Sequence, residues 1–301
     1  MLGIRTITGA RGLAAAGNKP SKYQALVDAL VDLQVATYDF RLSPRGNPQF
    51  MTQLKDMVEE SAKNSTAKVN LISHSLGGLV VHHFLTSFVS EEWKQQFIQS
   101  WIPLAPAYGG TKYTLKQLIS GDAALIPWLR GKDVRDQQRS YETSVWLLPD
   151  RRLYDGVIVS SPFKNYTIDD YFELFQDARL KTFTLQWYRV KDLTLWNENN
   201  QLADPNVTVY PIYGNGVDTT EQLVYSSAAM EEEPSKITSS KGDGVINLKS
   251  LQAGNSWDKA QPPLELEGVS HVGILSEDRA IQYIQQVVEA HEDVLPLQIA
   301  R

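Results

Sequence analysis

The chain has 301 residues, 42% of them hydrophobic, which is enough for one large core or for a core with an inserted subdomain. The formal net charge is −6 and the sequence has no Lys/Arg cluster, so nucleic acid is not an expected partner. Because the chain contains no cysteine, disulfides, thiolate metal sites and a cysteine nucleophile are excluded.

The first third of the chain alternates predicted strands with predicted helices. The apolar patterns predict strands at residues 4–8, 35–40, 69–72 and 98–104. Helical spacing predicts helices that begin at the capping residue Ser21, near Phe50 and directly after Ser75. This alternation is typical of an α/β fold with a mostly parallel, doubly wound sheet.

The middle of the chain departs from this rhythm. Residues 111–205 show no regular strand–helix pattern, and we interpret them as a cap subdomain inserted over the carboxyl edge of the sheet. Strands are predicted again at 207–213 and 264–269, followed by a closing helix. The core is then expected to comprise residues 1–110 and 206–301. This order is that of an α/β-hydrolase that begins at its third strand, with the cap between the sixth and seventh strands.

The most informative motif is Ser73-His74-Ser75-Leu76-Gly77, between the third predicted strand and its helix. A serine at the apex of a strand–turn–helix is the sequence form of a nucleophile elbow, in which a tight turn lifts the hydroxyl off the sheet. Small residues two positions before and after the serine, Ser73 and Gly77, fit that crowded turn. Ordinary strand–helix turns also produce this pattern by chance, so the rest of the chain must supply the catalytic partners.

In this fold the acid and the histidine follow the serine along the chain. Of the five histidines, only His271 lies in a loop after the last predicted strand, which makes it the candidate base. Asp243, in a turn between two glycines, is the preferred acid, and Asp218 and Asp258 are alternatives. In such a triad the histidine takes the serine proton, and the carboxylate holds the imidazole in the right tautomer.

The remaining parts of the predicted site bind the oxyanion and the substrate. An oxyanion hole needs two backbone donors, and the N–H of Leu76 is the first candidate. The second should come from the loop after the first strand, at Ala10 or Arg11. Tyr108, just past the fourth predicted strand, is a candidate for the wall of the substrate pocket.

Several further segments resemble the lecithin:cholesterol acyltransferase and lysosomal phospholipase A family. Gly242-Asp243-Gly244 falls where that family carries its acid, and His271 falls where it carries its base. The other matching segments, in chain order, are Tyr38-Asp39-Phe40-Arg41-Leu42-Ser43-Pro44, Leu104-Ala105-Pro106-Ala107-Tyr108-Gly109-Gly110, Ser120-Gly121-Asp122, Ser161-Pro162-Phe163-Lys164-Asn165-Tyr166-Thr167 and Tyr210-Pro211-Ile212-Tyr213-Gly214-Asn215-Gly216. The resemblance covers nearly the whole chain.

The resemblance implies a serine acyl hydrolase or O-acyltransferase. Its substrate would be a glycerophospholipid or another acyl-ester lipid, cleaved through an acyl-enzyme. The acyl group would then pass to a sterol, another alcohol or water. The resemblance implies no metal or organic cofactor, and it implies action at a membrane or lipoprotein surface.

The chain also departs from the family pattern. It begins at the strand that carries the oxyanion loop, so we expect it to lack the family's N-terminal lid and membrane-binding segment. Ser73 stands where the family's elbow has glycine. The sequence has no apolar run typical of a signal peptide or a membrane span, which as written favours the cytoplasm, whereas the family is mostly secreted or lumenal.

Two other functions fit the same motifs. A soluble carboxylesterase or lipase acting on simple acyl esters would have a small, closed pocket. A hydrolase-fold binding protein with a dead site would fail to bring the three candidate side chains together. Action on phospholipid instead predicts an exposed apolar patch on residues 111–205 next to Ser75.

Overall fold

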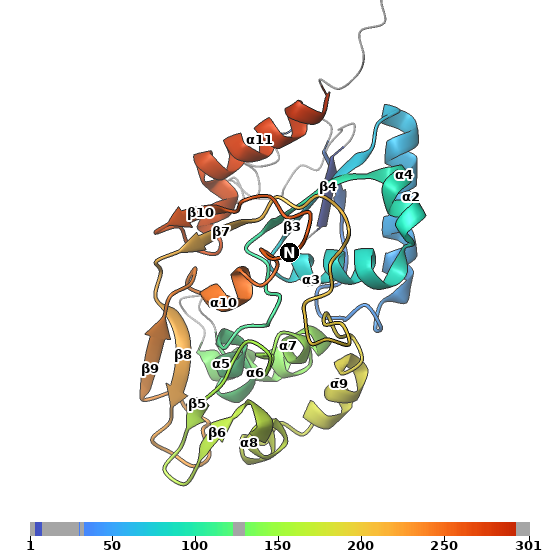
Figure 1. Cartoon of the computed structure of the whole chain (residues 1–301). Coiled ribbons are helices and arrows are strands. Elements are labelled where there is room, and N and C mark those ends of the chain that lie inside the picture. Colours follow the sequence, from blue (N-terminus) through green and yellow to red (C-terminus); the bar gives the residue numbers. More distant parts are fainter. Residues whose placement is uncertain (1–3, 8–29, 31–32, 123–129, 293–301) are drawn as a thin grey trace, which may run out of the picture.

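The computed structural model describes residues 4–7, 30, 33–122 and 130–292 (Figure 1). Its main sheet has six strands in the order β10-β7-β4-β3-β1-β2. The strands are β1 (Ile4–Ile7), β2 (Leu33–Ala36), β3 (Val69–His74), β4 (Ile98–Leu104), β7 (Ile212–Asn215) and β10 (Leu264–Glu267). The pairs β3–β4, β4–β7 and β7–β10 are parallel, as predicted for an α/β-hydrolase.

One strand runs against the predicted direction. β1 is antiparallel to both of its neighbours, β2 and β3. Apolar residues in a short strand predict burial but not direction, because parallel and antiparallel ladders both satisfy the backbone. The sheet is therefore mostly parallel at its centre and mixed at the β1–β2 edge.

The strand predicted at 207–213 forms only in part. Residues 208–210 exchange backbone hydrogen bonds with Trp101 of β4, at 2.8 Å from the Trp101 N to the Thr208 O and 2.9 Å from the Tyr210 N to the Trp101 O. Pro211 faces the other neighbour, where its carbonyl accepts the Leu264 N–H at 2.9 Å but it has no N–H to donate. The regular strand β7 begins only at Ile212. The alternation of apolar residues located this segment correctly but could not place its start.

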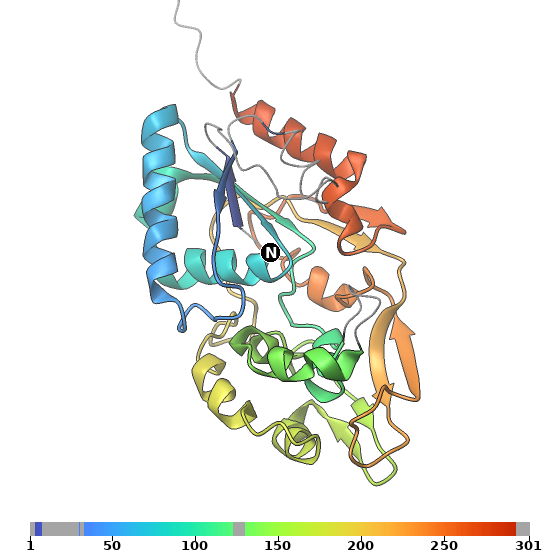
Figure 2. The ribbon, with the colours of Figure 1, turned by 180° about the vertical axis from the view of Figure 1, so that it is seen from behind.

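Helices cover both faces of the main sheet, and Figures 1 and 2 show α2 and α11 on opposite sides. The core between the sheet and α2, α3 and α4 contains Leu71 and Trp101, and the core under α11 contains Ile72 and Ile284. Consecutive strand residues such as Leu71 and Ile72 point to opposite faces, so one strand supplies both cores. These helices are α2 (Pro48–Ser65), α3 (Leu76–His83), α4 (Glu91–Phe97) and α11 (Asp278–Glu292), with a π-helical turn at Phe84–Phe88 and a 3₁₀ turn at Gly273–Ser276.

The cap lies below the main sheet in Figure 1 and has a core of its own. It contains the helices α5 (Tyr113–Ile119), α6 (Gly131–Arg139), α7 (Glu142–Trp146), α8 (Tyr171–Asp177) and α9 (Phe183–Val190), with a 3₁₀ turn at Ile168–Asp170. Its sheet, in the order β6-β5-β8-β9, joins β5 (Val157–Ser160) and β6 (Asn165–Thr167) to β8 (Thr219–Val224) and β9 (Lys236–Ser240). The sequence assigned residues 219–240 to the core, but they add the two strands β8 and β9 to the cap sheet. The short helix α10 (Leu248–Leu251) follows them.

None of the described helices is long and apolar enough to cross a membrane.

Candidate active site

Ser75 occupies the sharp turn between β3 and α3. Its backbone has φ 57° and ψ −125°, a conformation that residues other than glycine rarely adopt. Strain of this kind costs about 1–3 kcal/mol and persists only where the surroundings fix it. Here the Ser75 N–H donates to the Leu104 carbonyl of β4 over 3.0 Å, which ties the turn to the sheet. The turn is a nucleophile elbow, with the serine raised at the strand end.

Two small residues let the elbow pack tightly. A Cβ added to Gly78 would lie 2.8 Å from the Cβ of Pro106, so α3 crosses the loop after β4 at a distance that only glycine allows. The elbow motif pointed to Gly77 but not to Gly78. Ser73 is also more than a tolerated small residue, because its buried Oγ accepts a hydrogen bond from the Trp101 indole N–H at 2.9 Å.

The structure brings Ser75, His271 and Asp243 together, although they come from three separate parts of the chain. The His271 Nε2 lies 2.8 Å from the Ser75 Oγ, and the His271 Nδ1 lies 2.7 Å from the Asp243 Oδ2. All three residues are buried. With the proton on Nδ1 donated to the carboxylate, the bare Nε2 is placed to accept the serine proton.

Asp243 is held in place by its own loop. Its second carboxylate oxygen, Oδ1, accepts the backbone N–H groups of Val245 at 3.0 Å and Ile246 at 2.7 Å. Gly244, between Asp243 and Val245, has φ 92°, a conformation suited to glycine that closes this turn. The two alternative acids, Asp218 and Asp258, are exposed, and neither bonds to His271 in the described part of the chain.

The predicted oxyanion hole is described only in part. Leu76 is the first residue of α3, so its N–H has no acceptor within the helix and lies next to the nucleophile. Ala10 and Arg11, the candidates for the second donor, lie outside the described residues. Among the described residues, no group of three His, Asp or Glu side chains is arranged to hold a metal ion.

Two further histidines near the elbow are buried and were not assigned from the sequence. Burial lowers the pKa of His74 to about 3 and the pKa of His82 to about 4, so both rings are neutral at pH 7. The His82 Nε2 bonds the Ala203 carbonyl at 2.7 Å, and its ring stacks on Trp257. His74 directly precedes Ser75 in the elbow motif, and this position is the sequence signal that could have identified it as part of the site.

A pocket of about 870 Å³ lies between the elbow helix and the cap. Leu79 on α3 and the buried Tyr108 after β4 line it, so Tyr108 lies in a pocket wall as expected from the sequence. Ser75 is not among the lining residues; Leu79, about one helical turn further along α3, is the nearest lining residue on the elbow helix. Trp146, Trp187 and Trp196 form much of the cap side.

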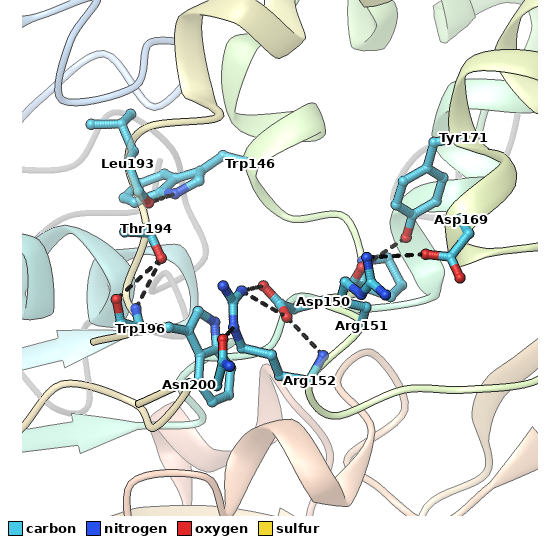
Figure 3. A network of polar contacts seen from close by, with 11 residues as sticks. Trp146, Asp150, Arg151, Arg152, Asp169, Tyr171, Leu193, Thr194, Trp196 and Asn200 are labelled. Atoms are coloured by element: carbon cyan, nitrogen blue, oxygen red, sulfur yellow. Dashed lines mark hydrogen bonds and ion pairs between the residues drawn. The ribbon is translucent and has the colours of Figure 1, made fainter. Parts of the chain in front are cut away.

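Figure 3 shows that the cap side of this pocket is fixed by polar contacts. The Arg152 guanidinium pairs with Asp150 at 2.9 Å, bonds the Asn200 amide oxygen at 3.1 Å and lies over the Trp196 ring. The Trp146 indole N–H donates to the Leu193 carbonyl at 3.0 Å. These contacts hold Trp146 and Trp196 in the pocket wall.

Comparisons with known proteins agree with this geometry. The family model for lecithin:cholesterol acyltransferase matches residues 29–285. The chain is 36% identical to lecithin-cholesterol acyltransferase-like 1 of Arabidopsis thaliana, covering 84% of this chain and 59% of that protein. It is 30% identical to the lysosomal phospholipase A and acyltransferase of Canis lupus familiaris, covering 89% of this chain and 67% of that protein.

A solved structure supports the same fold. The crystal structure of the Tle4-Tli4 complex matches with a TM-score of 0.56 and 14% identity, covering 87% of this chain and 68% of that one. The chain spans about three fifths to two thirds of the length of the curated relatives it matches. With the family model matched over most of its length, the chain belongs to the lecithin:cholesterol acyltransferase family.

Proposed function

We propose that the protein is a serine acyl hydrolase or O-acyltransferase that cleaves an acyl ester of a glycerophospholipid. The hydrogen-bonded series Ser75–His271–Asp243 at a strained elbow carries this proposal. Family membership supplies the substrate class, because the relatives carry the names phosphatidylcholine-sterol acyltransferase and lysosomal phospholipase A and acyltransferase.

The chemistry follows from the geometry of the three side chains. His271 Nε2 takes the Ser75 proton as Oγ attacks the ester carbonyl, and the Leu76 N–H stabilises the oxyanion. The tetrahedral intermediate collapses, the glycerol oxygen leaves with the proton from His271, and the acyl group stays on Ser75. Water or an alcohol then attacks the acyl-enzyme, giving its proton to His271, and the second collapse returns that proton to Ser75.

The cap favours a lipid substrate over a short ester. The pocket of about 870 Å³ is near the upper end of the usual range for small-molecule sites. On the cap, α8 and α9 carry Phe172, Leu185 and Tyr188, whose surfaces are 50%, 58% and 60% exposed. Phe172 also lines the pocket and packs against Phe183 and Trp187 of α9. We propose that these exposed apolar side chains of the two helices, called the α8–α9 face, meet the lipid surface.

Product analysis on phosphatidylcholine–sterol vesicles tests the proposal, with the wild type and Ser75→Ala side by side. Fatty acid and lysophospholipid formed only by the wild type would establish a phospholipase A. Steryl ester formed only by the wild type would establish a sterol acyltransferase. A wild type that turns over p-nitrophenyl butyrate but no phospholipid would overturn the proposed substrate in favour of a carboxylesterase. Loss of both activities would favour a binding protein.

A further inference from the structure

His74 makes a direct contact with the loop that carries the base. It precedes Ser75 in the elbow and is 4% exposed. Its Nε2 lies 2.8 Å from the backbone carbonyl oxygen of His271. Because a carbonyl oxygen only accepts hydrogen bonds, the His74 Nε2 carries the proton and donates it. The two imidazole rings also lie side by side, with centroids 4.8 Å apart and planes inclined by 36°.

The bonds around His271 divide between two segments. Its backbone N–H donates to the Asp243 carbonyl at 2.7 Å, and its Nδ1 bonds the Asp243 side chain, so the acid loop holds one side. The bond from His74 holds the carbonyl on the other side and comes from the strand that carries the nucleophile. The position of the base relative to Ser75 therefore depends on a link between β3 and the histidine loop.

The neutral His74 ring suits a site in which His271 gains and loses a positive charge during the reaction. Burial keeps the pKa of His74 at about 3, and the neighbouring His271 acts in the same direction. His74 therefore stays neutral when His271 becomes an imidazolium, and no second positive charge opposes that step.

We propose that His74 is a positioning residue, which fixes the histidine loop so that the His271 imidazole meets the Ser75 hydroxyl. The inference rests on the proposed function, since it assigns His74 a part in the same acyl transfer. A misplacement of about 1 Å in a catalytic group can cost about 100-fold in rate.

The test compares His74→Gln, whose amide keeps a donor at similar reach, with His74→Phe, which keeps an aromatic ring without the donor. On p-nitrophenyl butyrate we expect His74→Gln to retain kcat within about threefold. We expect His74→Phe to lose about 10- to 100-fold in kcat with little change in KM. If His74→Phe does not fold, His74→Asn takes its place, because its shorter amide cannot reach the carbonyl. Equal kcat values for the donor-free and donor-keeping variants would overturn the proposal.

A second comparison separates positioning from a merely structural role. In a His271→Ala background the base is absent, so adding His74→Phe should leave the residual rate unchanged. A further loss as large as in the wild-type background would overturn the proposal. The proposed substrate is judged separately, because a wild type that cleaves p-nitrophenyl butyrate but not phosphatidylcholine leaves this comparison intact. A wild type that cleaves neither ester and does not react with a fluorophosphonate would overturn both proposals.

Discussion

At the residue scale, Asp243 is the acid that holds His271, and mutation distinguishes it from the two alternatives in the sequence, Asp218 and Asp258. Asp243→Asn should lower kcat by about 10⁴-fold, because the amide no longer holds His271 in the tautomer that accepts the serine proton. The fold should survive, since an asparagine Oδ1 still accepts the Val245 and Ile246 N–H groups. The exposed Asp218→Asn is the matched control and should stay within about twofold of wild type. Kinetics on p-nitrophenyl butyrate check both, and the reverse ranking would make the assignment wrong.

The sequence predicted the three candidate catalytic residues because the fold fixes their order. Ser75 and His271 each follow a predicted strand, and Asp243 lies in a turn between two glycines. It did not predict the parts played by His74, Ser73 and Gly78. The bond from His74 reaches a residue 197 positions away, and the Cβ clearance at Gly78 is set by Pro106. Contacts between distant segments leave no local pattern, so they become visible only in the folded chain.

At the element scale, the elbow helix α3 depends on its close approach to the loop after β4. In an exposed helix, replacing glycine with alanine stabilises by about 1 kcal/mol. At Gly78 the new methyl group would meet the Pro106 Cβ at 2.8 Å, so we expect Gly78→Ala to reduce the free energy of unfolding by about 1–3 kcal/mol. Urea unfolding measures the difference. A variant as stable as the wild type would mean that the helix can shift away without cost.

The α8–α9 face makes a separate prediction about lipid. The double variant Leu185→Ser with Tyr188→Ser should lower phosphatidylcholine vesicle turnover by about tenfold or more, because burying one large apolar side chain is worth about 1.5–3 kcal/mol. Turnover of p-nitrophenyl butyrate should not change. Ile237→Ser is the matched control, since Ile237 is 44% exposed on β9, across the cap from α9 in Figure 1. Equal losses in the double variant and the control would count against a docking role for this face.

The elements themselves were only partly predictable. Apolar spacing located the strands of the core and the helices α2, α3 and α11, but not the antiparallel direction of β1 or the late start of β7. The helix predicted to begin at Ser21 lies outside the described residues. The cap sheet could not be predicted either, because the pairing of β5 with β8 joins segments more than 50 residues apart. No strand was predicted within residues 214–242, where β8 pairs with its neighbour β9 and also with β5 in another part of the chain.

At the scale of the whole molecule, buried neutral histidines make stability depend on pH. The pKa of His82 is lowered to about 4, whereas an unfolded histidine titrates near 6.5. Between these values the unfolded chain binds more protons than the folded one, so stability should fall as the pH falls. His82→Gln should reduce this slope by up to about 1.4 kcal/mol per pH unit. Urea unfolding of both proteins from pH 7 to pH 4.5 measures it, and identical slopes would show that His82 does not contribute.

The central claim is that His271, held by Asp243, activates Ser75 as a nucleophile. Reaction with a fluorophosphonate followed by peptide mapping tests this claim most directly, because the reagent modifies an activated serine without requiring the natural substrate. We predict a single modification on Ser75 in the wild type and its loss in His271→Ala. Modification at another residue, no modification, or equally fast modification of Ser75 in His271→Ala would contradict the account.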